Sequence, residues 1–289
     1  MKGKNMIKIN NILQLIRVKH WVKNILIFIP LACSGLINYN NVLNCIIAFF
    51  SFCFASSFIY VINDIKDIEK DRLHPTKRNR PLASGKIKKS TAICIAVLVL
   101  ILSISTNTLI NNNIFNVSFY ILISYIIINI FYSFGLKNVA IVDIILLASG
   151  FILRVYYGAA IINVEVSDWL FLTILSASLF LGLGKRKKEL MTSEKSRKVL
   201  QEYNEAFLDK FQYVMLGLTL VFYSLWVIEQ DIKYLTFTIP LIIVVFMRYC
   251  LIIEKSNEGD PTTIFYQDKP LILLCIIYGL AMILLLSIF

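Results

Sequence analysis

Four oxygen-bearing side chains follow the second long apolar run of this chain at helical spacing. If residues 63–71 continue that run as a helix, 100° per residue places Asn63, Asp64, Asp67 and Asp71 within an arc of about 100°. Their donors are carboxylate and amide oxygens. Such hard donors suit Mg²⁺, which keeps waters and is usually shared with substrate phosphates. We therefore predict that these four residues hold Mg²⁺ and serve catalysis.

A cluster of bases follows at once. Pro75 is expected to end the helix, and Lys77, Arg78 and Arg80 come next. This order suits a diphosphate, because Mg²⁺ can bridge carboxylates to it while Lys and Arg bind its remaining oxygens. The alternative is a cytoplasmic loop whose charges form solvated ion pairs. Three carboxylates on one helical face, where an apolar run ends, favour the site.

Long apolar runs surround this charged segment. Of the 289 residues, 58% are hydrophobic and 16% are charged, and the mean hydropathy is +0.73. Runs of about 20 apolar residues are typical of membrane-spanning helices. We predict an all-α integral membrane protein, a single polytopic domain over residues 1–289. Its nine expected spans are residues 24–37, 42–62, 91–110, 117–134, 139–161, 169–184, 211–228, 234–253 and 270–288.

The basic residues are distributed unevenly among the connections, which predicts an orientation. The arm 1–23 and the loops 63–90 and 185–210 are rich in Lys and Arg, whereas most of the other connections have none. Because bases gather on the cytoplasmic side, the N-terminus is expected inside and the C-terminus outside. The net charge of +11 is then mainly a topology signal, and nucleic acid is not an expected partner. Both charged loops lie on one face, where they can close over one site.

Other residue types exclude several kinds of site. The six cysteines fall inside apolar runs without metal-ligand spacing, so they are expected to be small buried hydrophobes. With only His20 and His74 present, a histidine-based metal site is not expected. The arm 1–23 has no signal-peptide pattern and is predicted to be an amphipathic basic helix on the membrane surface, with Trp21 at headgroup level.

The motif Asn63-Asp64-x-x-Asp67-x-x-x-Asp71 resembles the first aspartate-rich motif of the UbiA prenyltransferase superfamily. The resemblance covers nearly the whole chain and implies nine transmembrane helices around a cytoplasm-facing cavity for a polyprenyl substrate and Mg²⁺. Finer similarity is to the decaprenyl-phosphate phosphoribosyltransferase branch. It lies in RVKHWVKNILIFIPL, HPTKRNRPLASG, YSFGLKNVAIVDIILLASGFILR, LGLGKRKKEL and GDPTTIFYQDKPL.

The second charged loop departs from the pattern of the aromatic prenyltransferases. They carry a second acidic motif there, whereas this chain has Gly-Lys-Arg-Lys-Lys-Glu at residues 184–189. By resemblance to the branch, Lys185, Arg186 and Glu189 are candidates for binding substrate phosphates. The alternative is a topology anchor, which Lys187 and Lys188 fit better.

Five further residues are substrate-binding candidates. Lys23 lies where the first run meets the cytoplasm, as either a headgroup anchor or a substrate contact. Tyr132 and Lys137 match the family's Y-S-x-x-L-K. Asp143 and Arg154 share one face of the fifth run, and ionisable groups inside a membrane usually face the protein interior. For the deeper Arg154, a structural partner or an outward snorkel is an equal alternative.

Together with these features, the resemblance to this branch implies an Mg²⁺-dependent transferase of a bacterial inner (cytoplasmic) membrane. It would move 5-phosphoribose from phosphoribosyl pyrophosphate (PRPP) to a polyprenyl phosphate at the cytoplasmic face and release pyrophosphate. One alternative is a prenyltransferase that uses a polyprenyl diphosphate to prenylate an aromatic or other acceptor. A second is a transporter or lipid-binding scaffold. The sequence makes no prediction of oligomeric state.

Overall fold

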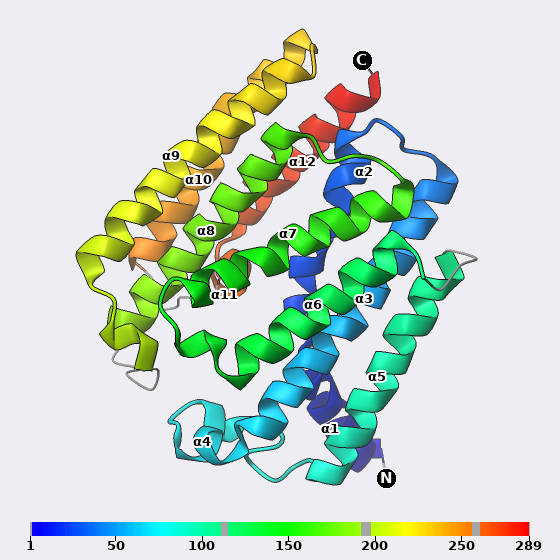
Figure 1. Ribbon diagram of the computed structural model, residues 1–289, viewed down its shortest axis with the longest axis vertical. Coiled ribbons are helices and arrows are strands. Elements are labelled where there is room, and N and C mark those ends of the chain that lie inside the picture. Colours follow the sequence, from blue (N-terminus) through cyan, green and yellow to red (C-terminus); the bar gives the residue numbers. More distant parts are fainter. Residues whose placement is uncertain (1, 111–114, 192–197, 256–260, 289) are drawn as a thin grey trace.

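All regular structure in the described part of the chain is helical. The computed structural model describes residues 2–110, 115–191, 198–255 and 261–288 (Figure 1). Its elements are α1 (Lys2–Leu15), η1 (Val18–Phe28), α2 (Ile29–Cys33), α3 (Tyr39–Lys66), α4 (Ile68–Leu73), η2 (Lys77–Asn79), α5 (Lys89–Ile110), α6 (Val117–Phe134), η3 (Leu136–Asn138), α7 (Val142–Ile162), α8 (Asp168–Met191), η4 (Lys198–Gln201), α9 (Glu205–Glu229), η5 (Lys233–Phe237), α10 (Thr238–Lys255), α11 (Pro261–Gln267) and α12 (Lys269–Ile288).

Within these ranges, 8 helices are long and apolar enough to cross a membrane. They are α3, α5, α6, α7, α8, α9, α10 with its leading turn η5, and α12. The first expected span, residues 24–37, is built differently: η1 is a 3₁₀ helix of 11 residues, and α2 adds 5. The pair covers Val18–Cys33 and so begins six residues before the expected span. At about 2.0 Å per 3₁₀ residue and 1.5 Å per α residue its whole length is roughly 30 Å, the thickness of the hydrocarbon core. Because this segment is not among the 8 long apolar helices, the ninth crossing stays a prediction.

Asparagine side chains begin three of the long helices. Asn38, Asn116 and Asn204 accept hydrogen bonds from backbone amides three residues ahead, at 2.9, 2.8 and 2.7 Å, at the starts of α3, α6 and α9. Asparagine is a preferred N-cap because its side-chain oxygen satisfies an amide that the first turn leaves without a partner. The polar residues between apolar runs therefore fix where these helices begin.

Small polar side chains tie the helices together inside the bundle. The hydroxyls of Ser51 on α3 and Ser103 on α5 each donate to the other's carbonyl, at 2.8 and 2.9 Å. Tyr157 on α7 donates to Asn107 on α5 at 2.8 Å. Where the surroundings are apolar, such bonds satisfy groups that have no water partner. They hold α3, α5 and α7 in a fixed register.

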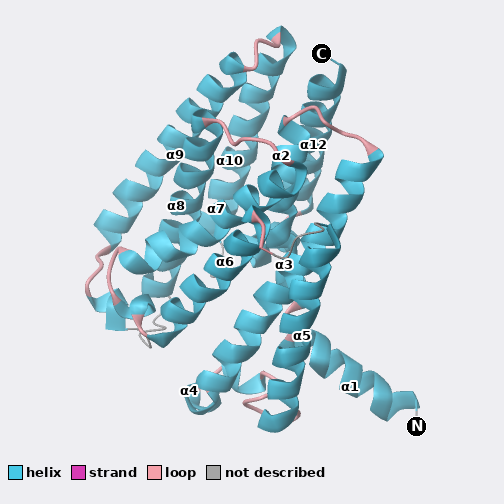
Figure 2. Cartoon of the chain, turned by 45° about the vertical axis from the view of Figure 1, so that its right-hand side comes forward, coloured by secondary structure: helices cyan, strands magenta, loops and turns pink. Residues whose placement is uncertain are grey.

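The chain ends and the charged segments have a clear arrangement. The N- and C-termini lie at opposite ends of the bundle, and α4 lies near the N-terminal end (Figures 1 and 2). Which end faces the cytoplasm stays a prediction. In α1, Ile12 packs against a core that includes Leu15 and Val61, whereas Ile9 and Leu13 are exposed. That exposed apolar pair fits the predicted membrane-surface arm.

The structure corrects two expectations about the charged segments. The helix does not continue from the second span to Pro75, because α3 ends at Lys66 and α4 begins at Ile68. Residues 185–191 are not loop, because α8 runs on to Met191. The expectation that the cysteines are buried also holds only in part: Cys45 and Cys53 are buried, three others are partly buried, and Cys94 is exposed.

Candidate active site

Two buried carboxylates share one guanidinium where α3 gives way to α4. Asp64 and Asp71 are 2% and 5% exposed. Nη1 of Arg80 donates to Oδ1 of Asp64 at 3.2 Å and to Oδ2 of Asp71 at 2.6 Å. Arg17, from the turn before η1, donates to the same Asp64 oxygen at 2.5 Å. Four residues from three parts of the sequence thus form one compact ionic cluster.

Asp67 points to a different partner because the helix breaks at this residue. It caps α3, and its amide donates to the Asn63 carbonyl at 2.9 Å. Its carboxylate accepts from Lys137 in η3 at 3.2 Å. No group of three or more His, Cys, Asp or Glu side chains in the described ranges is arranged to hold a metal ion. The expectation that all these carboxylates share one face of a continuous helix is therefore wrong, since Asp64 and Asp71 converge without Asp67.

The basic turn after Pro75 lies beside this cluster. Lys77 is partly buried and begins η2, whereas Arg78 is exposed. Arg80 leaves η2 in extended backbone, and its side chain reaches back to the carboxylates. The sequence placed acids and bases in consecutive segments, and the structure folds the second segment onto the first.

The end of α6 connects the first cluster to a second. Lys66 donates to the Ser133 carbonyl at 2.7 Å and lies 4.0 Å from the centre of the Phe134 ring. Lys137 reaches Asp67, and the hydroxyl of Tyr132 reaches Arg186 on α8. The segment from Tyr132 to Lys137 therefore contacts both predicted charged regions.

Arg186 is the centre of the second cluster and is fully buried. Its Nε donates to Asp143, Nη1 donates to Glu189 at 2.6 Å, and Nη2 donates to the Tyr132 hydroxyl at 3.0 Å. Asp143 is also fully buried. Each nitrogen of the guanidinium thus has a protein partner, so Arg186 orders α6, α7 and α8. Lys185, one residue earlier on α8, is less buried than Arg186.

Tyr203 completes the second cluster, and no motif or spacing in the sequence pointed to it. Its hydroxyl donates to Asp143 at 2.6 Å and accepts from the Ile141 amide at 2.6 Å. Burial, and then the hydrogen bond to Asp143, raises the pKa of this hydroxyl above its ordinary value. The hydroxyl therefore stays protonated and secures Ile141, whose φ of 68° lies in the left-handed region.

Lys187 joins three helices. It donates to Asp209 on α9 at 2.6 Å and to Glu254 on α10 at 3.2 Å. Lys188 is buried as well. Both side chains are therefore packed between helices. A lysine that served only as a topology anchor would instead be exposed to solvent.

Arg154 lies deep in the bundle among uncharged partners. It donates to Asn24 at 2.7 Å, to the Gly150 carbonyl, and to the Tyr125 hydroxyl at 3.3 Å. Its guanidinium carbon also lies 5.0 Å from the centre of the Phe52 ring. These contacts agree with the structural alternative, because Arg154 ties α7 to η1 and does not snorkel outward.

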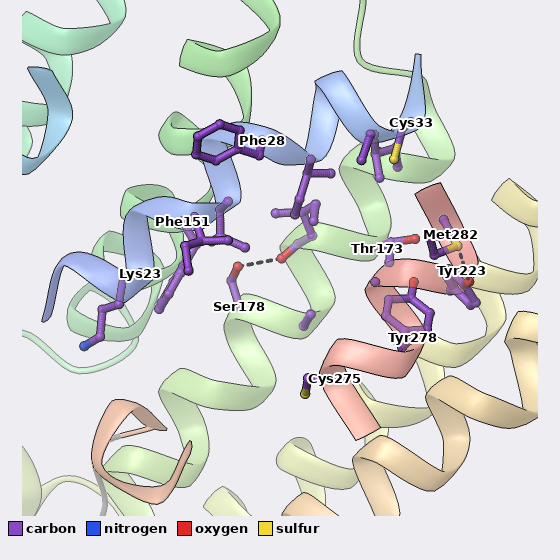
Figure 3. Close-up of a pocket in the computed structure, with 18 of the residues that line it drawn as sticks. Lys23, Phe28, Cys33, Phe151, Thr173, Ser178, Tyr223, Cys275, Tyr278 and Met282 are labelled. Carbon is purple, nitrogen blue, oxygen red and sulfur yellow. Dashed lines mark hydrogen bonds between the residues drawn. The ribbon is translucent and has the colours of Figure 1, made fainter. Parts of the chain in front are cut away.

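An apolar cavity of about 630 Å³ lies between η1, α2, α8, α9 and α12. Lys23 lies at one end, and Cys33 and Met282 lie toward the other (Figure 3). Among the described lining residues, Lys23 alone is charged. An apolar space with a cation at one end has the chemistry that a lipid tail with an anionic head would require.

A match to the UbiA prenyltransferase family extends over residues 25–269. The chain belongs to the UbiA prenyltransferase family. The chain is 31% identical to a decaprenyl-phosphate phosphoribosyltransferase from Mycobacterium tuberculosis over 283 residues, 92% of this chain and 90% of the relative. It is 32% identical to the enzyme of that name from Corynebacterium glutamicum over 281 residues, 91% and 82% of the two chains.

The UbiA fold is also found among solved structures. A UbiA homologue from Archaeoglobus fulgidus, bound to GPP and Mg²⁺, superimposes with a TM-score of 0.74 at 20% identity, covering 96% of this chain and 99% of that one. The resemblance carried by the sequence motifs is thereby confirmed. The protein is a multi-pass membrane transferase of the UbiA family.

Proposed function

We propose that this protein transfers 5-phosphoribose from PRPP to a polyprenyl phosphate at the cytoplasmic face of a bacterial inner membrane, releasing pyrophosphate. The observation that carries the proposal is the cluster of two buried carboxylates around Arg80, in a bundle that also holds an apolar cavity where, among the described lining residues, Lys23 alone is charged. The relatives named decaprenyl-phosphate phosphoribosyltransferase support it, since they match over more than 90% of this chain.

The donor set at the first cluster fits Mg²⁺. All candidate donors are oxygens, and Asp64 and Asp71 already converge on one cationic group, the Arg80 guanidinium. We propose that these two carboxylates hold the metal, with Asp67 and Asn63 adjacent. Bound Mg²⁺ supplies positive charge against the leaving diphosphate. Solved UbiA homologues that contain Mg²⁺ or Cd²⁺ support divalent-metal use.

Basic side chains at the rim would bind the substrate phosphates. Lys77, Arg78 and Lys185 are partly or fully exposed beside the two clusters, and Arg80 and Lys137 contact the carboxylates directly. Cationic side chains with several donors bind phosphate through charge-assisted hydrogen bonds. Four buried or partly buried residues would support the site without binding substrate, because their polar atoms are already hydrogen-bonded to other protein groups: Asp143, Arg154, Arg186 and Glu189.

The transfer itself needs little proton chemistry. An oxygen of the polyprenyl phosphate would form a bond to the anomeric carbon of PRPP while the bond from that carbon to the diphosphate breaks. The nucleophile is already an anion, so a general base is not required. Lys23 would bind the lipid phosphate while the apolar cavity holds the first part of the prenyl chain. Catalysis would then come from positioning and charge stabilisation.

A donor-exchange assay on the purified full chain tests the proposal. With Mg²⁺, PRPP and a polyprenyl phosphate, we expect lipid-linked phosphoribose and stoichiometric pyrophosphate. Asp67→Asn should lose about 100-fold or more in turnover, because a charge that positions Lys137 at the site is removed. Glu69→Gln is the matched control, since Glu69 is an exposed acid on the adjoining α4.

The same assay separates the alternatives. Turnover of a polyprenyl diphosphate with an aromatic acceptor, and none with PRPP, would establish the prenyltransferase alternative. A transporter or scaffold would bind lipid with no product in either reaction, and Asp67→Asn would leave that binding unchanged.

A further inference from the structure

Arg80 occupies the space between the two carboxylates that converge in the first cluster. A single atom, Nη1, is bonded to Asp64 at 3.2 Å and to Asp71 at 2.6 Å. With Arg17 on Asp64, two guanidinium groups balance two carboxylates, so the cluster has no net charge as it stands. This neutrality matters because two buried carboxylates without a cation would strongly disfavour joint ionisation.

The two arginines are held differently. Arg17 lies 4.7 Å from the centre of the Tyr60 ring, and its side chain is 20% exposed. Tyr60 stands one helical turn before Asp64 on α3, so ring and carboxylate fix the Arg17 guanidinium together. The Arg80 side chain is 30% exposed and comes from the irregular segment after η2. Arg80 is therefore the cation that can leave, while Arg17 stays.

We propose that Arg80 is the resident counter-ion of the metal site and exchanges with the metal when substrate arrives. Mg²⁺ binds oxygen at about 2.0–2.1 Å, so an ion shared by Asp64 and Asp71 needs the space that Nη1 occupies. The displaced guanidinium keeps its charge and lies at the rim, where a diphosphate oxygen offers it a new bidentate partner. Metal and phosphate therefore bind together: metal alone must compete with Arg80, whereas a metal–diphosphate complex supplies the anion that Arg80 needs.

This inference rests on the proposed function for its diphosphate but can be measured without turnover. Mn²⁺ is the probe, and the Mn²⁺ bound to the full-length protein in detergent is measured by equilibrium dialysis, with and without pyrophosphate; the protein-free compartment accounts for the Mn²⁺–pyrophosphate complex in solution. In the wild type, pyrophosphate should tighten Mn²⁺ binding about tenfold or more. Arg80→Met should bind Mn²⁺ alone about tenfold more tightly, since one charged hydrogen-bonded competitor is removed. In that variant the effect of pyrophosphate should nearly vanish.

Arg72→Met is the matched control. Arg72 belongs to the same charged segment, and its removal also deletes one positive charge, but it pairs with the exposed Glu69. General electrostatics would make both variants bind Mn²⁺ equally more tightly, whereas competition singles out Arg80. Arg80→Lys should fall between wild type and Arg80→Met, because one ammonium cannot reproduce the planar guanidinium. Because Arg80→Lys keeps the positive charge, it replaces Arg80→Met as the test variant if Arg80→Met does not fold.

Two results would overturn the proposal: Arg80→Met binding Mn²⁺ alone no more tightly than Arg72→Met, or a wild type indifferent to pyrophosphate. The outcome is separable from the donor assignment. If Arg80→Met binds Mn²⁺ more tightly but the wild type forms no product from PRPP, the exchange of Arg80 with the metal is supported and only the assignment of PRPP as donor is wrong. If the wild type turns over PRPP but Arg80→Met binds Mn²⁺ no more tightly than the wild type, the proposed function is supported and the exchange of Arg80 with the metal is refuted.

Discussion

Gly158 on α7 should not tolerate even a methyl group. A Cβ at this position would lie 2.0 Å from the carbonyl oxygen of Ile27 and 2.9 Å from its carbonyl carbon. Both atoms are backbone, so no side-chain rotation can relieve the clash. Ile27 would have to retreat by about 1.4 Å to reach the 3.4 Å at which ordinary contact begins. Gly158 is thus the residue that lets η1 approach α7 closely.

The energetic effect of Gly158→Ala has two opposing parts. Replacing glycine by alanine inside a helix favours folding by up to about 1 kcal/mol. Overpacking a close contact costs about 1–3 kcal/mol, and a clash with backbone belongs at the upper end. We expect a net loss of about 2 kcal/mol, which for a chain of this size lowers the thermal midpoint by about 5 °C. Because η1 carries Lys23, lipid-dependent activity should fall as well.

Thermal unfolding of the purified protein in detergent measures this effect. The matched control is Gly217→Ala on α9, where an added Cβ would meet nothing within 4 Å. The control should be neutral or slightly stabilising. An equal midpoint for the two variants would refute the reasoning, since it would mean that η1 and α7 are not in close contact in the folded protein.

Two further predictions concern buried and exposed ion pairs. Arg186→Met should destabilise the protein by about 3–5 kcal/mol in the same unfolding assay, because it leaves Asp143 buried without its cation. Adding Asp143→Leu to that variant should restore much of the lost stability, which would confirm the pairing. A double variant no more stable than Arg186→Met would contradict it. Arg248 donates to Asp268 and holds the pKa of that carboxyl below its ordinary value of 3.8. The pair therefore stabilises the fold above that pH and loses its effect as the pH falls through the lowered pKa, so the midpoint difference between wild type and Arg248→Met should shrink in acid.

The long apolar runs were read correctly from the sequence. Eight of the nine predicted runs form long apolar helices, because hydropathy and length suffice to specify a helix that a membrane can surround. The motif from Asn63 to Asp71 and the basic segments led to the UbiA family, which the comparisons bear out. The predicted site residues Asp64, Asp71 and Arg80 form one cluster, although their metal role is still a prediction.

The internal structure of the site came from the tertiary fold. Arg17 pairs with Asp64 across 47 residues, Arg186 with Asp143 across 43, and Arg154 with Asn24 across 130. A side chain's partner at such separations depends on how whole helices pack, which periodicity does not encode. The sequence by itself therefore determined the apolar spans, the positions of the charged segments and the family. Only the tertiary structure decided that α3 breaks at Asp67, that Arg186 is buried as a support, and that Arg80 lies between two carboxylates. The physical reason is that burial and most of the charge pairing at the site are satisfied between helices and segments that packing brings together, and hydropathy periodicity does not specify that packing.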